Sequence, residues 1–272
     1  PMVSIKDGPS GTVPLLCVPG AGATAISFLD LAGGLEQLGP IEGLQPRGLD
    51  GALVPHSTVP AAARAYLRCI EQKYPTGPVH LLGHSFGGWV VFELAQMLRA
   101  AGRPVASLTI LDSEAPGSNG LLGREYSRTE AMMELVDLYE QAAQCSLEIA
   151  PNQMDALGPL DQLELLSERL RRAGLLPRRS RSSDLIGMVR TFEVALRIGY
   201  RPAESYPDPV GLALAPDPKK DQQANELEFE SRIAGWRRWA PNLTVWRSPG
   251  NHMTQLRQPH VTALTGWLLS ML

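Results

Sequence analysis

The sequence predicts an α/β fold, with a mostly parallel central sheet flanked by helices and one long helical insertion. Short apolar runs such as Val13–Val18, Val79–Leu82 and Val105–Leu111 alternate with helical patterns of 10 to 15 residues. This alternation is typical of right-handed βαβ units. Between about residues 117 and 200 the apolar runs stop and helical patterns follow one another. The 272 residues, 44% of them hydrophobic, are enough to bury a sizeable core as a single domain.

The N-terminal part begins with the strand Val13–Val18, which ends at a Pro-Gly-Ala-Gly turn containing Ala21. Apolar residues at helical spacing then predict a helix between Ile26 and Leu38. A weaker strand is expected over 41–49, followed by a helix from Pro60 that ends before Tyr74-Pro75.

The central feature is Gly83-His84-Ser85-Phe86-Gly87, which joins the apolar strand before it to a helical pattern after it. A G-x-S-x-G sequence in this context indicates a nucleophile elbow, because the glycines leave room for a sharp strand-to-helix turn. Ser85 would then be the nucleophile. The N–H of Phe86, at the start of the helix, and that of Ala21, after the neighbouring strand, are candidates for an oxyanion hole.

A base and an acid follow the nucleophile along the chain. His252 lies on a glycine loop after the last predicted strand, Leu243–Arg247, which is where the histidine of such a site belongs in the order Ser, acid, His. Asp112 and Asp217 each follow a strand and are both candidates for the acid. Asp217 lies in a polar, proline-rich turn, where aspartate is common. Asp112 ends an apolar strand and needs a partner to offset its burial, so it is favoured.

The insertion at about 117–200 is expected to cover the pocket as a lid. Three helices are predicted in it: one opened by a capping box of Ser127 and Glu130, one over 160–172 and one over 183–198. Flexible apolar surface near the substrate pocket is expected from Leu121, Leu122, Met132, Met133, Leu135 and Val136, of which Met132, Met133 and Val136 are predicted pocket residues. Such a lid would exclude water and favour ring closure over hydrolysis.

Composition excludes several other classes of protein. A net charge of −3 gives no reason to expect nucleic acid, and no run of about 18 apolar residues could span a membrane. No leader sequence is recognisable, and the three cysteines are expected to be reduced in a cytoplasmic protein. We predict no metal site and no cofactor of the protein's own. The chain begins at Pro1 without an initiating Met, which suggests that it was excised from a longer protein.

Four motifs in order resemble the type I, chain-terminating thioesterase domains of nonribosomal peptide synthetases and polyketide synthases, which have the α/β-hydrolase fold. They cover nearly the whole length: LLCVPGAGA at 15–23, GHSFGG at 83–88, LTILDSEAP at 108–116 and GNHM at 250–253. The spacing of 27 positions from Ser85 to Asp112 also matches that family. Free-standing type II editing thioesterases are similar too, but tend to carry the acid after the later strand and Met where Phe86 stands.

The resemblance implies a single thioesterase domain, with a core of 1–116 and 201–272 and a lid at 117–200, excised from the C-terminus of a multidomain synthetase. An upstream peptidyl or acyl carrier protein would deliver the thioester on 4′-phosphopantetheine. Ser85 would accept the acyl chain, and water or an internal nucleophile would then release a linear acid or a ring. The alternatives are an editing thioesterase, another acyl hydrolase or a non-catalytic binding module. The intact set of Ser85, Asp112 and His252 argues against the binding module.

Overall fold

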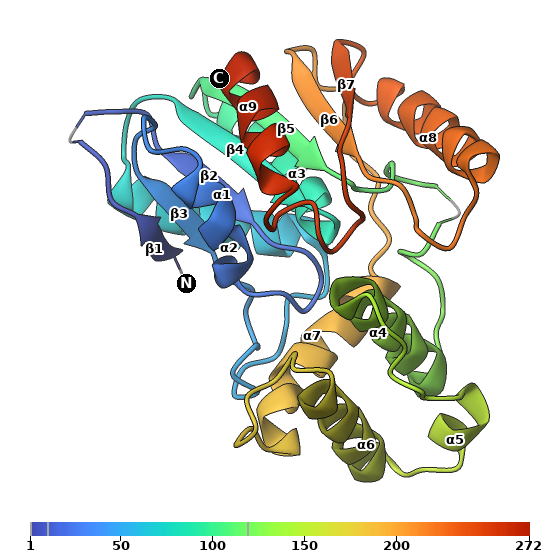
Figure 1. The fold of residues 1–272 in the computed structure, drawn as a ribbon. Helices are drawn as coiled ribbons and strands as arrows, with labels where there is room; N and C mark the ends of the chain where they lie inside the picture. Colours follow the sequence, from blue (N-terminus) through green and yellow to red (C-terminus); the bar gives the residue numbers. More distant parts are fainter. Residues whose placement is uncertain (1, 10, 119) are drawn as a thin grey trace.

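The centre of the computed structural model, which describes residues 2–9, 11–118 and 120–272, is a single sheet (Figure 1). Pro1, on which the expectation of excision rested, lies outside the described residues. The sheet has seven strands in the order β1-β3-β2-β4-β5-β6-β7 within the described part of the chain. Their bounds are β1 (Met2–Lys6), β2 (Leu15–Val18), β3 (Ile41–Leu44), β4 (Val79–His84), β5 (Val105–Leu111), β6 (Val210–Leu214) and β7 (Leu243–Arg247).

The predicted α/β class and the mostly parallel sheet are confirmed, since every pairing from β3 to β7 is parallel. The exception is β1, which pairs antiparallel with β3 at the edge of the sheet. The sequence analysis missed β1 because none of its five residues is buried, so it forms no apolar run.

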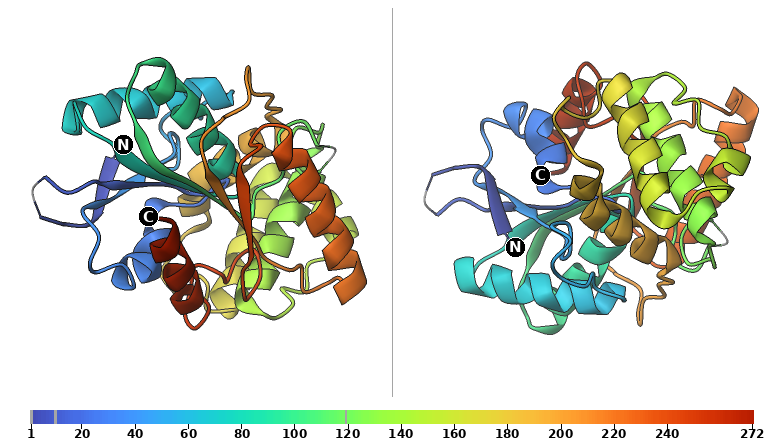
Figure 2. Two further views of the ribbon diagram at one scale, coloured as in Figure 1. Left: turned by 90° about the horizontal axis from the view of Figure 1, so that it is seen from above. Right: turned by 90° about the horizontal axis from the view of Figure 1, so that it is seen from below.

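Helices cover both faces of the sheet (Figure 2). One apolar cluster joins α2, α3 and α8 to one face, and a second joins η1, α1 and α9 to the other. The helix expected between Ile26 and Leu38 is shorter than predicted, because Gly33 and Gly34 end it and Ile26 stays exposed. The bounds are η1 (Ala25–Phe28), α1 (Leu29–Gly33), α2 (Val59–Lys73), α3 (Phe86–Ala100), α8 (Gln222–Arg237) and α9 (Val261–Met271).

The segment between β5 and β6 is helical and forms a separate lobe below the carboxyl ends of the strands (Figure 1). It contains α4 (Arg128–Ala143), α5 (Pro151–Asp155), α6 (Pro159–Arg172), η2 (Ser182–Leu185) and α7 (Ile186–Arg197). The Ser127–Glu130 capping box at the start of α4 is present as predicted. The short helix α5 was not predicted, because five residues are too few to show a helical period.

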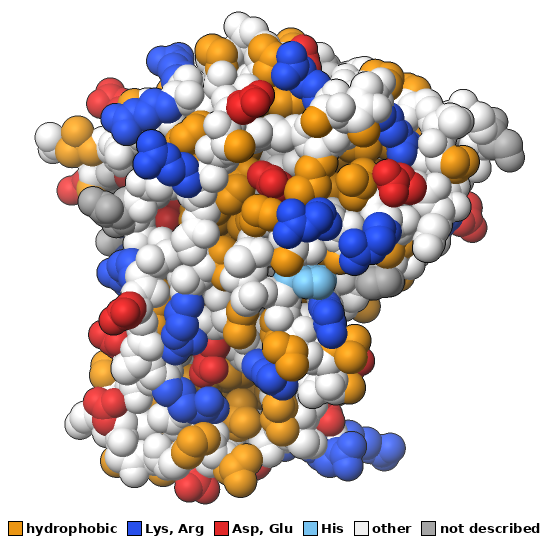
Figure 3. Space-filling model, turned by 180° about the vertical axis from the view of Figure 1, so that it is seen from behind, with side chains coloured by type: hydrophobic (Ala, Val, Ile, Leu, Met, Phe, Trp, Pro, Cys, Tyr) orange, Lys and Arg blue, Asp and Glu red, His pale blue; other side chains and the backbone are white. Residues whose placement is uncertain are grey.

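A space-filling view from behind shows a narrowing between the sheet and this lobe, with acidic and basic side chains interspersed on the surface (Figure 3). In the described part of the chain no helix combines the length and the hydrophobicity that a transmembrane helix requires.

Backbone hydrogen bonds bring the ends of three neighbouring strands into register beneath the helical lobe. The Ser85 N–H donates to the Leu111 carbonyl at 2.8 Å, and the Asp112 N–H donates to the Ala213 carbonyl at 2.7 Å. The residues that follow β4 and β5 therefore lie side by side at one edge of the sheet. This edge is where α/β folds build their sites.

The close approach of β2 to the start of α3 predicts that Gly87→Ala destabilises the protein by about 3 kcal/mol. A Cβ at Gly87 would lie 2.2 Å from the Val18 carbonyl oxygen, a backbone atom that cannot move aside locally. Chemical denaturation would measure the change. Gly33→Ala is the matched control, because a Cβ there meets nothing within 4 Å. If both variants unfold at the same denaturant concentration, the close packing at Gly87 is not a constraint on the fold.

Candidate active site

Ser85 occupies a strained turn between β4 and α3. Its backbone angles, φ of 55° and ψ of −127°, lie in a region that residues other than glycine rarely adopt. Such a conformation costs the folded state on the order of 1–3 kcal/mol. The hydrogen bond from its N–H to Leu111, and one from Gly88 N–H to the Ser85 carbonyl at 2.8 Å, hold this conformation. Ser85 thus has the geometry of a nucleophile elbow, with its side chain in the pocket at the N-terminus of α3.

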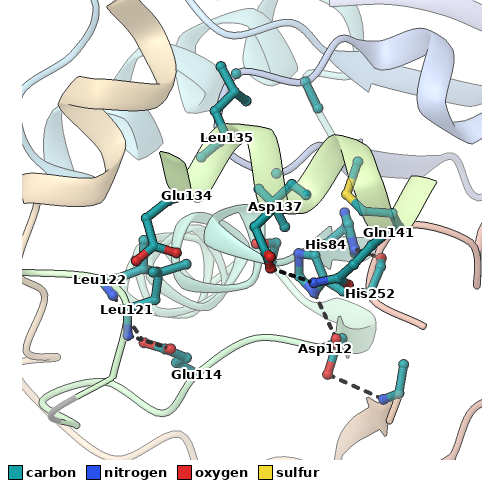
Figure 4. Close-up of a pocket in the computed structure, with 18 of the residues that line it drawn as sticks. His84, Asp112, Glu114, Leu121, Leu122, Glu134, Leu135, Asp137, Gln141 and His252 are labelled. Atoms are coloured by element: carbon teal, nitrogen blue, oxygen red, sulfur yellow. Dashed lines mark hydrogen bonds and ion pairs between the residues drawn. The ribbon is translucent and has the colours of Figure 1, made fainter. Parts of the chain in front are cut away.

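His252 and Asp112 meet across 140 residues of sequence (Figure 4). His252 Nδ1 lies 2.7 Å from Asp112 Oδ2, and Asp112 Oδ1 accepts from Ala215 N–H at 3.2 Å and from Arg232 at 2.8 Å. Burial by itself would raise the pKa of the Asp112 carboxyl. The hydrogen bond from His252, the charge of Arg232 and the Ala215 N–H together lower that pKa to about 2. Asp112 is therefore a carboxylate at neutral pH.

His84 packs against His252 from the end of β4. The two rings are 4.7 Å apart at their centroids, and His84 Nε2 lies 3.0 Å from the His252 carbonyl oxygen. This contact fixes the tautomer of His84, since only a protonated Nε2 can donate to a carbonyl. Burial, followed by the proximity of His252, lowers the pKa of His84 to about 3. His84 is thus a neutral support beneath the loop that carries His252.

The alternative acid, Asp217, does not contact His252. Its carboxylate accepts from the Lys219 N–H at 2.9 Å and pairs with Lys220 at 3.3 Å, in the turn before α8. Its own N–H donates to Asn225 at 2.7 Å. Asp217 lines the pocket, but its carboxylate stabilises the turn in which it lies, a common role of aspartate in polar turns.

The structure places the candidate oxyanion donors beside Ser85. The loop that contains Ala21 passes so close that a Cβ on Gly20 would lie 3.1 Å from the Ser85 Cβ. Phe86 is the first residue of α3, where N–H groups have no partner within the helix. Among the described residues, neither the Ala21 nor the Phe86 N–H donates a hydrogen bond to a protein atom. Both therefore stay candidates for binding an oxyanion.

A cavity of about 530 Å³ connects these residues with the helical lobe. Its apolar lining comes from several elements. It comprises Leu121 and Leu122 from the loop after β5, Leu135 and Leu138 from α4, Met188, Phe192 and Leu196 from α7, and Met253 and Leu256 from the loop after β7. In the part of the chain that the structure describes, no group of three or more His, Cys, Asp or Glu side chains is arranged to hold a metal ion.

Of the apolar residues expected at the pocket, Leu121, Leu122 and Leu135 line this cavity, whereas the expectation for Met132, Met133 and Val136 is wrong. None of these last three contributes to its wall, and Met132 and Val136 are buried inside the helical lobe instead. The reason is that α4 packs on two sides, against the other lid helices and against the pocket. Apolar residues of α4 contact the other lid helices as well as the pocket. Sequence periodicity shows that a residue is buried, but not which of these two surfaces it contacts.

The side of α4 that faces the cavity carries polar as well as apolar side chains, and the polar ones were not predicted to line the pocket. Glu134, Asp137 and Gln141 line the cavity at helical spacing, beside Leu135 and Leu138 of the same helix. Asp137 and Gln141 lie near His252 (Figure 4). Asp137 accepts from Gln141 Nε2 at 3.1 Å and forms an ion pair with Lys219, which ties the lid to the turn before α8. The polar stripe is visible in the sequence, but nothing there shows that it faces the pocket.

A family model described as the thioesterase domain matches residues 13–268 of the sequence. The chain belongs to this thioesterase family. Curated relatives include chondramide synthase of Chondromyces crocatus, 24% identical over 93% of this chain, and a nonribosomal peptide synthetase of Aspergillus terreus, 31% identical over 68%. The vanchrobactin synthetase of Vibrio anguillarum is 33% identical over 55% of the chain. The chain spans only 6%, 19% and 6% of these three relatives, respectively.

Solved structures share the fold at low identity. A four-domain nonribosomal peptide synthetase superposes with a TM-score of 0.84 at 20% identity over 99% of this chain and 20% of its own. The Vlm2 thioesterase domain, solved with a bound dodecadepsipeptide, gives 0.70 at 19% identity over 98% and 96%. The type II thioesterase BorB gives 0.69 at 19% over 99% and 96%. These likenesses confirm the α/β-hydrolase fold of this family.

The hydrogen bond between Asp112 and His252 predicts that Asp112→Asn lowers kcat by about 10⁴, because an amide donor would hold the imidazole in the wrong tautomer. Asp217→Asn, the matched control in the same pocket, should change kcat less than about threefold. Steady-state kinetics on a peptidyl thioester would measure both. A larger loss in the Asp217 variant would assign the acid to the later strand.

The low pKa of His84, about 3, predicts acid sensitivity of the fold. The unfolded chain takes up this proton near the ordinary histidine pKa of about 6.5, whereas the folded protein does not. Stability should therefore fall as the pH drops from about 6.5 toward 3, by at most roughly 1.4 kcal/mol per pH unit for this group. Urea unfolding between pH 7 and 4 should show a shallower fall for His84→Gln. Identical slopes in the two proteins would contradict a neutral, buried His84.

Proposed function

We propose that this domain releases a peptidyl or acyl chain from a carrier-protein phosphopantetheine thioester through an ester on Ser85. The observation that carries the proposal is the 2.7 Å contact between His252 and Asp112 in the same cavity as the elbow serine. In a member of the thioesterase family, this arrangement supports acyl transfer to Ser85.

His252 Nε2 takes the proton of the Ser85 hydroxyl as Oγ attacks the thioester carbonyl. Asp112 holds Nδ1–H and stabilises the imidazolium that forms, while the N–H groups of Ala21 and Phe86 bind the oxyanion. As the intermediate collapses, the C–S bond breaks and His252 returns the proton to the pantetheine thiolate. No hydrogen bond between Ser85 and His252 is formed among the described residues before substrate binds, and such contacts often close only in the substrate complex.

The second half of the reaction uses His252 again, now to deprotonate the nucleophile that attacks the Ser85 ester. Water gives a linear acid, and a hydroxyl or amine of the bound chain gives a ring. The apolar side of the cavity, with Leu138 and Phe192, suits a long acyl chain. The first lid helix presents Leu135 and Leu138 to the cavity together with the carboxylates of Glu134 and Asp137, so this wall suits an acyl chain and also admits water. Release by either route is therefore part of the proposal.

An upstream carrier domain is proposed as the partner, because the curated relatives include much longer synthetases of which this chain matches a small part. The phosphopantetheine arm then arrives with the substrate and is not a cofactor of this chain. The likeness to BorB supports a second candidate, editing of misloaded carriers by a type II enzyme. The position of the acid at the end of β5 favours chain release, given the family pattern described above.

The proposal predicts that Ser85→Ala lowers kcat on the order of 10⁶-fold while the fold is kept. A fluorophosphonate probe should label Ser85 in the unmodified protein and nothing in the variant. Ser27→Ala is the matched control, because Ser27 lines the same cavity and donates to the Thr24 carbonyl. Labelling that persists in Ser85→Ala would place the nucleophile elsewhere.

Mass spectrometry of products from a panel of carrier-bound peptidyl and short acyl thioesters separates the two candidates. Preference for long chains, with a linear acid or a ring as product, is the result expected of a releasing enzyme. Preference for short acyl groups over every long chain would support the editing function instead.

A further inference from the structure

Arg232 binds the carboxylate that orients His252. Its Nη1 lies 2.8 Å from Asp112 Oδ1, whereas His252 occupies Oδ2, so the guanidinium and the imidazole share one buried carboxylate. The Arg232 side chain is 21% exposed and that of Asp112 is 3% exposed. An ion pair at this depth is screened far less than a surface pair.

The structure of α8 explains why Arg232 reaches this position. Arg232 and Trp236 are one turn apart on the same face of the helix. Trp236 Nε1 donates to the Ser113 carbonyl at 3.0 Å, directly after Asp112. Gly235 lets the helix come close, since a Cβ there would lie 2.5 Å from the Ala115 Cβ. The helix is therefore fixed against the residues that follow β5, with Arg232 opposite Asp112.

The charges around Arg232 come from every neighbouring element. Glu228 on α8 pairs with it, and Glu114 after β5 also contributes to its raised pKa, although burial acts against the charged form. Lys220 pairs with Glu228 from the turn before α8, and His84 adds no charge at neutral pH. Arg232 is thus a fixed positive charge on the side of Asp112 away from His252.

We propose that Arg232 is a positioning residue: it holds Asp112 in the rotation that accepts from His252. The inference rests on the proposed function. Because the guanidinium and the Ala215 N–H fix Oδ1, Oδ2 stays directed at His252 Nδ1. The imidazole is thereby kept in the orientation in which its Nε2 can take the Ser85 proton.

The test compares kcat and KM, determined separately on a small neutral thioester, for three variants. Arg232→Met removes the charge and the hydrogen bond, Arg232→Gln removes the charge but keeps an N–H donor, and Arg237→Met removes an exposed arginine from the end of the same helix. Circular dichroism and thermal unfolding would verify that each variant is folded.

At the pH optimum, kcat should fall about tenfold in Arg232→Met while KM is unchanged, because the residue orients Asp112 and does not touch the substrate. The loss of kcat should be smaller in Arg232→Gln, because Gln still offers Asp112 an N–H donor. Arg237→Met should retain the kcat of the unmodified enzyme.

An unchanged kcat in the folded Met variant would overturn the inference, as would a change in KM alone, which would make Arg232 a substrate-binding residue. If Arg232→Met does not fold, an unchanged kcat in the Gln variant overturns the inference instead. Failure of the proposed function is separate: the unmodified protein would then neither turn over the thioester nor react with the fluorophosphonate at Ser85.

Discussion

The reversal of the chain at Ser85 is the constraint on which the site depends. A positive φ at a serine persists only when its surroundings hold it, and here the Leu111 carbonyl and the backbone of β2 do so. The space that Gly87 leaves for the Val18 carbonyl lets α3 start immediately after the strand. The same contacts that secure the sheet therefore place Ser85 in the cavity, at the N-terminus of α3.

Burial of the Asp112 charge organises the other half of the site. A carboxylate with a 3% exposed side chain needs several partners, and it finds them in His252, Arg232 and Ala215. These partners come from the loop after β7, from α8 and from the end of β6. One buried charge thus holds three elements together around the pocket, and each partner that stabilises the carboxylate also affects how strongly it supports the histidine.

The cavity joins surfaces of different character. Phe192 of α7 and Leu138 of α4 contribute apolar surface, whereas Glu134 and Asp137 of α4 contribute carboxylates. Under the proposed function, the apolar surface would hold an acyl chain and the carboxylates would face water or polar groups of the substrate. The ion pair of Asp137 with Lys219 links α4 to the core, so the polar side of the lid also contributes to the position of the lid.

The sequence by itself determined the features that depend on neighbours along the chain. The elbow at Ser85, the alternation of strands and helices, and the preference for Asp112 over Asp217 follow from local patterns of glycine, apolar residues and burial. Only the tertiary structure decided which face of α4 lines the cavity, because that helix packs on two sides and its apolar spacing is the same for both. It alone brought Arg232 to Asp112 across 120 residues. An ion pair between distant side chains depends on how α8 docks, and docking is a property of the assembled core.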